Sequence, residues 1–171
     1  MSLQIRQFVP SEVCLQCDGC CRFKAADSPW RPKLGKEEAK GLAAIVTQKD
    51  WLDDDSHIRT LRHCGEDVCQ FFNPGDHTCQ VYSDRPFECS LYPFILSRSP
   101  QGVEVYVHLS CPFVQDTQGS TEFEEYKVYL KGYFQTAPVL DFLKRNAGLV
   151  HDYSPFLMEL QHIFTIEGLT L

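Results

Sequence analysis

The stretch CLQCDGCC, residues 14–21, places four cysteines within eight residues, and Asp18-Gly19 adds a turn signal between them. Five more cysteines follow at positions 64, 69, 79, 89 and 111, which makes nine in 171 residues. A C-x2-C pair lets two sulfurs converge from one turn of chain, and this spacing is typical of tetrahedral zinc sites and iron–sulfur clusters. We therefore expect an irregular loop folded around a metal.

Composition decides between metal binding and disulfides. The chain is 43% hydrophobic, so it can bury a core without cross-links. Its first residues lack a basic segment followed by a long apolar one, and its longest apolar runs are too short to span a bilayer. We expect a cytoplasmic protein without a membrane partner, in which thiols stay reduced and clustered cysteines hold metal or serve catalysis.

The charge of the chain bears on its partners. Its formal net charge is −7 at pH 7, and no run of basic residues is present. An acidic surface repels phosphate backbones, so no nucleic-acid partner is expected. The remaining candidates are a protein partner or a small-molecule substrate, and the sequence identifies neither.

The donor atoms limit the metal. An all-thiolate set selects zinc, iron–sulfur clusters or Cu(I). With Cys20 the run becomes C-x2-C-x2-C, which also begins the bacterial ferredoxin motif. Nine thiols exceed the needs of one zinc site, which favours a [4Fe-4S] cluster over zinc or mononuclear iron. His77 and His108 are alternative ligands. Either Cys20 or Cys21 is a ligand while the other packs, or the two serve different centres.

Periodicity predicts an α+β fold: a loop-rich cysteine core with a small antiparallel sheet, surrounded by helices, and a helical C-terminal third. The turn signal at 73–76 separates CQFF from CQVY and predicts a hairpin. GVEVYVHLS alternates as a strand does, with SLYPFILS as its expected partner. Helices are expected over residues 36–48, from a capping box at Thr121 and Glu124, from Pro138 to Lys144, and from Ser154 to about Phe164. The aromatic stripe behind Thr121 is interpreted as core. We expect a single domain, 1–171, with a metal-binding core at 14–113 and a helical part at 116–171.

These motifs together resemble the CxxCxxCC family of zinc- or iron-chelating proteins. CLQCDGCC is similar to the signature that names the family, and CQFFNPGDHTCQVYSDRPFECSLYPF is similar to its second motif. The matching positions of the second motif are Cys69, Cys79, Tyr82, Arg85, Pro86, Cys89 and Pro93. Cys111-Pro112 resembles the late cysteine of the family, whereas Cys64 is additional.

The resemblance implies metal binding. The candidate ligands are Cys14, Cys17, Cys20, Cys21, Cys69, Cys79, Cys89 and Cys111. Arg85 and Tyr82 are candidate cofactor-binding residues, because a guanidinium can offset the charge of a thiolate site. The expected function is a redox or maturation factor with a metal or cluster. A distant resemblance to the cysteine motif of the much longer flagellin lysine N-methylase adds a cluster-dependent methyltransferase-like enzyme, and a structural-zinc interaction module is the other alternative.

Overall fold

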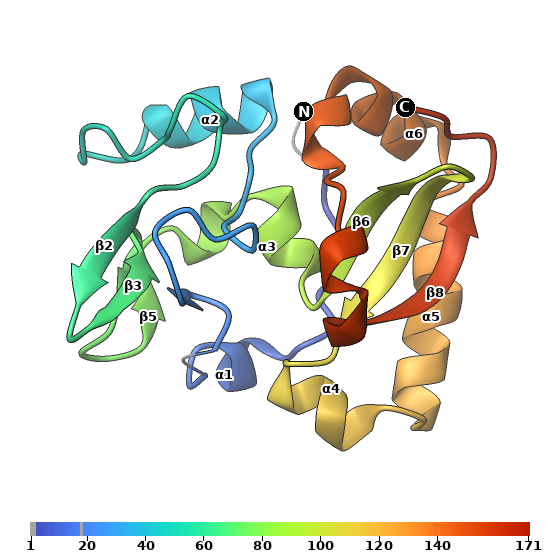
Figure 1. The fold of residues 1–171 in the computed structure, drawn as a ribbon, viewed down its shortest axis with the longest axis horizontal. Helices are drawn as coiled ribbons and strands as arrows, with labels where there is room; N and C mark the ends of the chain where they lie inside the picture. The colour runs from blue at the N-terminus through green and yellow to red at the C-terminus, as the bar shows by residue number, and fades with distance from the viewer. Residues whose placement is uncertain (1–2, 18) are drawn as a thin grey trace. The chain divides into compact units, whose positions relative to one another are not determined.

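The computed structural model describes residues 3–17 and 19–171 (Figure 1). Asp18, the first residue of the expected Asp18-Gly19 turn, lies outside the described residues. The chain divides into two compact units, which are described separately. The first unit contains residues 3–4 and 9–90, and the second contains residues 5–8 and 91–171. The expectation of a single domain stays a prediction.

The first unit, called the cysteine-rich unit below, consists of short elements joined by turns. Its helices are α1 (Ser11–Cys14), α2 (Lys36–Ala43), the 3-10 turn η1 (Tyr82–Asp84) and α3 (Phe87–Leu91), whose last residue opens the second unit. Its strands are β1 (Arg22–Phe23), β2 (Thr60–His63), β3 (Glu66–Cys69), β4 (Phe72–Asn73) and β5 (Thr78–Cys79). The strands form an antiparallel sheet in the order β1-β3-β2 and the expected hairpin β4-β5.

Apolar side chains from these short elements gather into one core. Phe71 is completely buried, and its ring lies 5.5 Å from that of Trp51. The other buried members are Phe23, Leu34, Leu42, Ile58, Val68, Cys69, Phe72 and Val81. Burial of such side chains contributes about 1.5–3 kcal/mol each, so this core fixes the loops that carry the cysteines.

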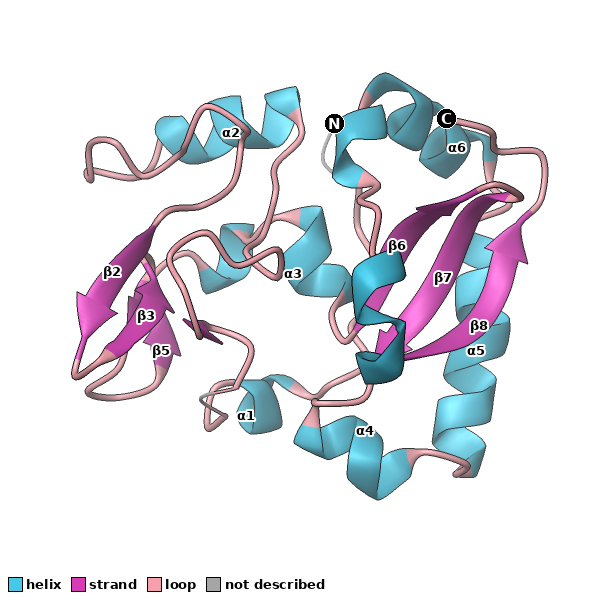
Figure 2. Ribbon diagram, in the orientation of Figure 1, coloured by secondary structure: helices cyan, strands magenta, loops and turns pink. Residues whose placement is uncertain are grey.

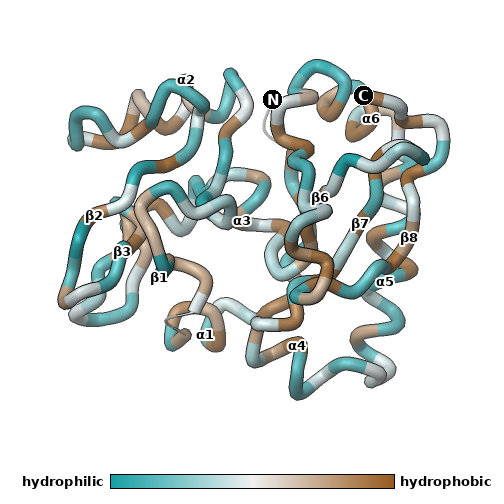
Figure 3. Tube along the Cα trace, viewed as in Figure 1, coloured by the Kyte–Doolittle hydropathy of each residue, from teal (hydrophilic) through white to brown (hydrophobic). Residues whose placement is uncertain are grey.

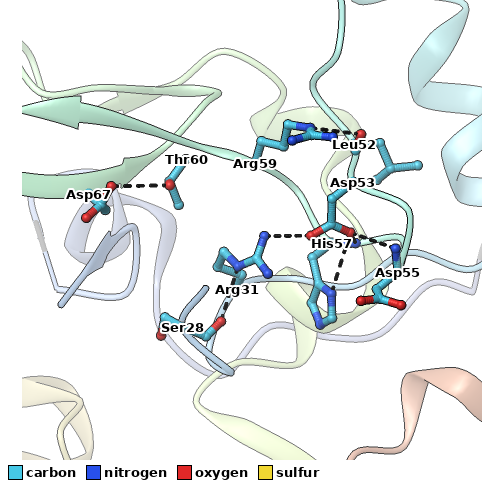
Figure 4. A network of polar contacts seen from close by, with 9 residues as sticks. All are labelled: Ser28, Arg31, Leu52, Asp53, Asp55, His57, Arg59, Thr60 and Asp67. Atoms are coloured by element: carbon cyan, nitrogen blue, oxygen red, sulfur yellow. Dashed lines mark hydrogen bonds and ion pairs between the residues drawn. The ribbon is translucent and has the colours of Figure 1, made fainter. Parts of the chain in front are cut away.

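A carboxylate braces the loop between α2 and β2 (Figure 4). Asp53 accepts hydrogen bonds from the amides of Asp55 and His57, at 3.0 and 2.8 Å, and from the Arg31 guanidinium at 2.8 Å. Burial opposes ionisation of Asp53, but the His57 amide and the Arg31 charge outweigh it and lower the pKa of Asp53. The network therefore ties the segment before α2 to the segment before β2.

The second unit is a three-stranded antiparallel sheet with helices. Its strands are β6 (Phe94–Ser99), β7 (Gly102–His108) and β8 (Leu160–Ile166), with β7 in the centre. Its helices are α4 (Pro112–Thr117), α5 (Thr121–Tyr133) and α6 (Ala137–Arg145), and its 3-10 segments are η2 (Ala147–Leu149) and η3 (Ser154–Glu159). Figure 2 shows α5 running along one face of this sheet.

The alternating residues of β7 explain the packing of the second unit. Val103, Val105 and Val107 are completely buried, and they share one face because side chains alternate along a strand. The aromatic stripe of α5 provides Phe123 and Tyr126 to the core, as expected. The predicted pairing of GVEVYVHLS with the preceding apolar segment is confirmed by β6 and β7.

Three element predictions need correction. The chain from Ser154 forms a short 3-10 segment and then strand β8, whereas a helix to Phe164 was expected. Residues 160–166 are a strand because they pair with β7. Helix α2 ends at Ala43 and not at residue 48, with Ile45 left 54% exposed. The N-cap of α5 is Ser120, whose hydroxyl accepts from the Phe123 amide. The expected capping box of Thr121 and Glu124 is therefore not formed, because the helix is capped one residue earlier and its N3 residue is Phe123.

The mixture of helices and small antiparallel sheets confirms the α+β class, and the C-terminal third is helical only in part, because β8 lies there. Figure 3 shows hydrophobic and hydrophilic residues interspersed along both units. None of the helices in the described part of the chain is both long and apolar enough to cross a membrane.

Candidate metal centre

Three cysteine sulfurs accept hydrogen bonds from amides two or three residues further on. The Cys17 Sγ accepts from the Gly19 amide at 3.4 Å. Cys69 accepts from the Phe71 and Phe72 amides, and Cys79 accepts from the Val81 amide. The last two lie in the matching segments CQFF and CQVY. Such bonds favour the thiolate form, which is the form that binds metal.

The sheet and the hairpin bring distant cysteines together. The Cys69 amide donates to the Cys21 carbonyl at 2.8 Å, which joins the end of β3 to the first motif. Cys79 pairs with Phe72 across the β4-β5 hairpin. Because residues 70 and 71 alone separate Cys69 from that hairpin, both cysteines are placed by one continuous backbone network.

Helix α3 supplies Cys89, and the Glu38 carboxylate anchors the start of that helix. One oxygen of Glu38 accepts from the Phe87 amide at 2.6 Å, and the other accepts from the Gly35 amide at 2.8 Å. Glu38 therefore caps α2 and α3 at once. Glu88 adds a bond from the Lys33 amide at 2.7 Å.

Seven sulfurs of the cysteine-rich unit lie close enough for their charges to interact. They belong to Cys14, Cys17, Cys20, Cys21, Cys69, Cys79 and Cys89. Burial, together with smaller contributions from neighbouring thiolates, raises the pKa of Cys14 to about 11 and that of Cys69 to about 12. Burial also raises the pKa of Cys79 and of Cys89. A metal cation would relieve this mutual repulsion, which is the electrostatic requirement of a thiolate site.

Cys20 and Cys21 interact directly with each other. The Cys21 thiol donates a hydrogen bond to Cys20, which lowers the pKa of Cys20 and raises that of Cys21. The residue Cys20 is exposed to solvent, whereas Cys21 is half-buried. The two neighbours therefore occupy different environments within the cluster.

Arg85 and Tyr82 flank the first motif. The Arg85 guanidinium stacks 4.0 Å from the centre of the Tyr82 ring, and its Nε donates to the Ser90 hydroxyl at 3.2 Å. The Arg85 charge lowers the pKa values of Cys14, Cys20 and Cys79. For Cys14 and Cys79 burial has the larger effect, so their pKa values remain raised. Tyr82 also forms a side-chain hydrogen bond with Cys14. Arg85 is thus a positive charge that acts on three thiols of the cluster.

Two cysteines differ from these seven. Cys64 is exposed in the turn between β2 and β3, at a positive φ of 47°. Cys111 is buried and precedes α4, within the second unit, so its role as a ligand stays a prediction. In that unit, His108 Nδ1 lies 3.2 Å from the Tyr92 hydroxyl. His77 packs its ring edgewise on Phe72.

The fit of this cluster to a metal rests on its donors. Thiols with amide N–H partners and one neighbouring guanidinium are the donor set that zinc and iron accept. Across residues 3–17 and 19–171, no group of three or more His, Cys, Asp or Glu side chains is arranged to hold a metal ion. The donors present therefore fit in kind and number, and not in their side-chain positions.

Sequence reasoning did not identify Glu38 or Ser90. Glu38 stands three residues after Gly35, the spacing by which a side chain returns to the N-cap amide, so its bond to Gly35 was visible in the sequence. Its second bond, to Phe87, joins residues far apart in the chain and had no local signal. Ser90 had no local signal in the sequence either.

The comparisons with known proteins agree with the donor set. A family model named CxxCxxCC, described as a putative zinc- or iron-chelating domain, matches residues 13–126. That range begins just before Cys14 and ends within α5. No curated protein and no solved structure matches the chain.

Proposed function

The chain belongs to the CxxCxxCC family of zinc- or iron-chelating domains, and on that premise we propose that its cysteine-rich unit holds an iron–sulfur cluster in a redox or maturation role. Chelation of zinc or iron is the property of the family. The [4Fe-4S] cluster is the finer part of the proposal.

The spacing of the first motif carries the proposal. The seven neighbouring sulfurs are enough for the four thiolate ligands that either a zinc ion or a [4Fe-4S] cluster requires. The C-x2-C-x2-C spacing of Cys14, Cys17 and Cys20 supports a cluster, since it presents three sulfurs from one segment.

The chain's own residues would perform three tasks around the cluster. Thiolates from the first motif would hold it, with a further sulfur such as that of Cys89. The amide of Gly19 donates a hydrogen bond to the Cys17 sulfur. Arg85 offsets part of the negative charge of the thiolates. A bound iron–sulfur cluster supplies one-electron transfer, with a potential that depends on such charges and hydrogen bonds.

A structural zinc ion is the second candidate, and a specific observation favours it. Cys69 and Cys79 each begin a turn whose amide donates back to the sulfur, and both turns belong to hairpin-like segments. Paired turns of this kind suit a closed tetrahedral site that holds short strands together. Under this alternative the unit is an interaction module, and the metal contributes only folding energy.

Anaerobic purification followed by absorption spectroscopy and elemental analysis of the same sample tests the proposal. A cluster predicts brown protein that contains iron and sulfide in comparable amounts, with a reversible change of the spectrum on reduction. Colourless protein with stoichiometric zinc would replace the cluster with the zinc alternative. Protein that binds neither metal, even after reduction of its thiols, would overturn both.

A further inference from the structure

We propose that Phe8 is a positioning residue for metal binding, because its ring joins chain segments that lead to three of the candidate ligands. The residue precedes the first cysteine motif and belongs to the second unit. Its role is to restrict the chain at the motif before a metal binds, so that less conformational freedom is lost on binding. This inference rests on the proposed function, since it concerns how the same thiols are presented to their metal.

The ring of Phe8 is the centre of an aromatic cluster within the second unit. Phe8 is 4% exposed, and the ring centres of Phe94 and Phe113 lie 5.6 and 5.2 Å from its own, both edge to face. Two rings of α5 complete the cluster, Phe123 at 5.7 Å and Tyr126 at 4.9 Å. Pairs of this geometry attract each other beyond the effect of burial, so the Phe8 side chain is held from several sides.

Two of these rings come from segments that adjoin candidate ligands. Phe94 begins β6, which follows α3, the helix that carries Cys89. Phe113 lies in the first turn of α4, directly after Cys111-Pro112. Phe8 therefore contacts the segment that leaves one candidate ligand and the segment that leaves another.

The segment from Phe8 to the first motif is short and held. The chain passes from the second unit to the cysteine-rich unit between Phe8 and Val9, and Val9 is buried. Pro10 follows with its restricted backbone. Its carbonyl accepts from the amides of Val13 and Cys14, at 3.0 and 2.9 Å. A displacement of Phe8 is therefore passed on to Cys14 with little slack.

Backbone hydrogen bonds of Arg6 hold the same segment on α5. The Arg6 amide donates to the Tyr129 hydroxyl at 2.9 Å, and the Tyr126 hydroxyl donates to the Arg6 carbonyl. The Arg6 guanidinium also lies 4.5 Å from the centre of the Tyr129 ring. Residues 5–8 are thus fixed by their backbone as well as by the Phe8 ring.

The zinc affinity of the reduced full chain, measured anaerobically by competition with a chromophoric chelator, tests the inference. Phe8→Ala should weaken zinc binding about tenfold, a typical size for coupling between separate sites. The matched control is Leu143→Ala, which removes another completely buried side chain of the second unit, from α6. It should bind zinc as wild type does. Unchanged affinity in Phe8→Ala, or equal losses in both variants, would overturn the inference.

A second pair of variants loosens the segment without opening a cavity. Tyr126→Phe/Tyr129→Phe removes the two hydroxyls that bond to the Arg6 backbone and keeps both rings. Tyr133→Phe is the matched control, because the Tyr133 hydroxyl of the same helix has no hydrogen-bond partner among the described residues. The double variant should bind zinc about threefold more weakly, and the control should not. Equal affinities would overturn the inference even if Phe8→Ala fails to fold.

Hydrogen exchange provides a readout that a loss of stability alone would not imitate. Coupling between sites is reciprocal, so zinc should slow amide exchange in α5, which contains no cysteine. The slowing should be absent in Phe8→Ala. Exchange in α5 that zinc leaves unchanged in the wild-type chain would overturn the inference and leave chelation intact. A wild-type chain that binds neither zinc nor iron would instead refute the proposed function.

Discussion

Glu38 provides the sharpest test of how the fold positions Cys89. Its carboxylate accepts the Gly35 amide at 2.8 Å and the Phe87 amide at 2.6 Å, and so caps two helices. Loss of a side-chain cap costs about 1 kcal/mol. Glu38→Ala removes both caps and should destabilise the cysteine-rich unit by about 2 kcal/mol, which is a factor of about 30 in the unfolding equilibrium.

Urea unfolding followed by tryptophan fluorescence measures this loss. Both tryptophans, Trp30 and Trp51, lie in the cysteine-rich unit, so the signal reports on that unit alone. Glu37→Ala is the matched control, because Glu37 is an exposed neighbour in the same first turn of α2. A loss of stability for Glu38→Ala no larger than that of this control would show that the two caps do not stabilise the unit.

The ionisation of Glu38 adds a pH signature. Burial raises the pKa of Glu38, although the two amides oppose this. A raised folded-state pKa gives stability that is present below the unfolded-state value and declines as pH rises through the folded-state value. Glu38→Gln keeps an acceptor without the charge, so its stability should lack this decline. An identical pH profile in the two proteins would contradict a raised pKa of Glu38 in the folded state.

Three further predictions concern other parts of the molecule. Asp53→Ala should cost about 1–3 kcal/mol of folding stability at neutral pH. Because the pKa of Asp53 is lowered, the stability difference between wild type and variant should vanish as pH falls through that pKa. A stability difference that stays constant in acid unfolding would contradict this prediction. Leu130→Ala removes a completely buried side chain of α5 and should cost about 2–5 kcal/mol of folding stability. Val128 on the same helix is 75% exposed, so Val128→Ala should change thermal stability by less than about 0.5 kcal/mol. Similar losses in the two variants would refute this packing. Arg85→Gln should move the pH midpoint of zinc binding upward, because the guanidinium lowers the pKa values of Cys14, Cys20 and Cys79; zinc titrations at several pH values with an unchanged midpoint would exclude that role.

The sequence predicted the elements whose signals are local. The hairpin around residues 73–76 follows from its turn residues, and its Gly75 amide does donate to the Asn73 side chain at 3.0 Å. Strand β7 follows from strict alternation. The gathering of cysteines from two distant motifs was inferred from the thiol chemistry and from resemblance, and no local pattern showed which sulfurs would become neighbours.

Strand β8 could not be read from the sequence for a physical reason. Its register shifts between Val105 and Tyr106, which pair with Phe164 and His162, so Ile163 is left over. Such a bulge breaks the two-residue alternation of a strand. The Ser154-Pro155 pair meanwhile provides a strong helix-start signal. Tertiary pairing with β7 therefore overrode the local preference.

Cysteine sulfurs are the ligands by which this protein is expected to hold its metal. X-ray absorption at the edge of the bound metal measures this directly in the full chain. The expected spectrum has a first coordination shell dominated by sulfur, at about 2.3 Å if the metal is zinc. A first shell composed of nitrogen and oxygen would contradict it.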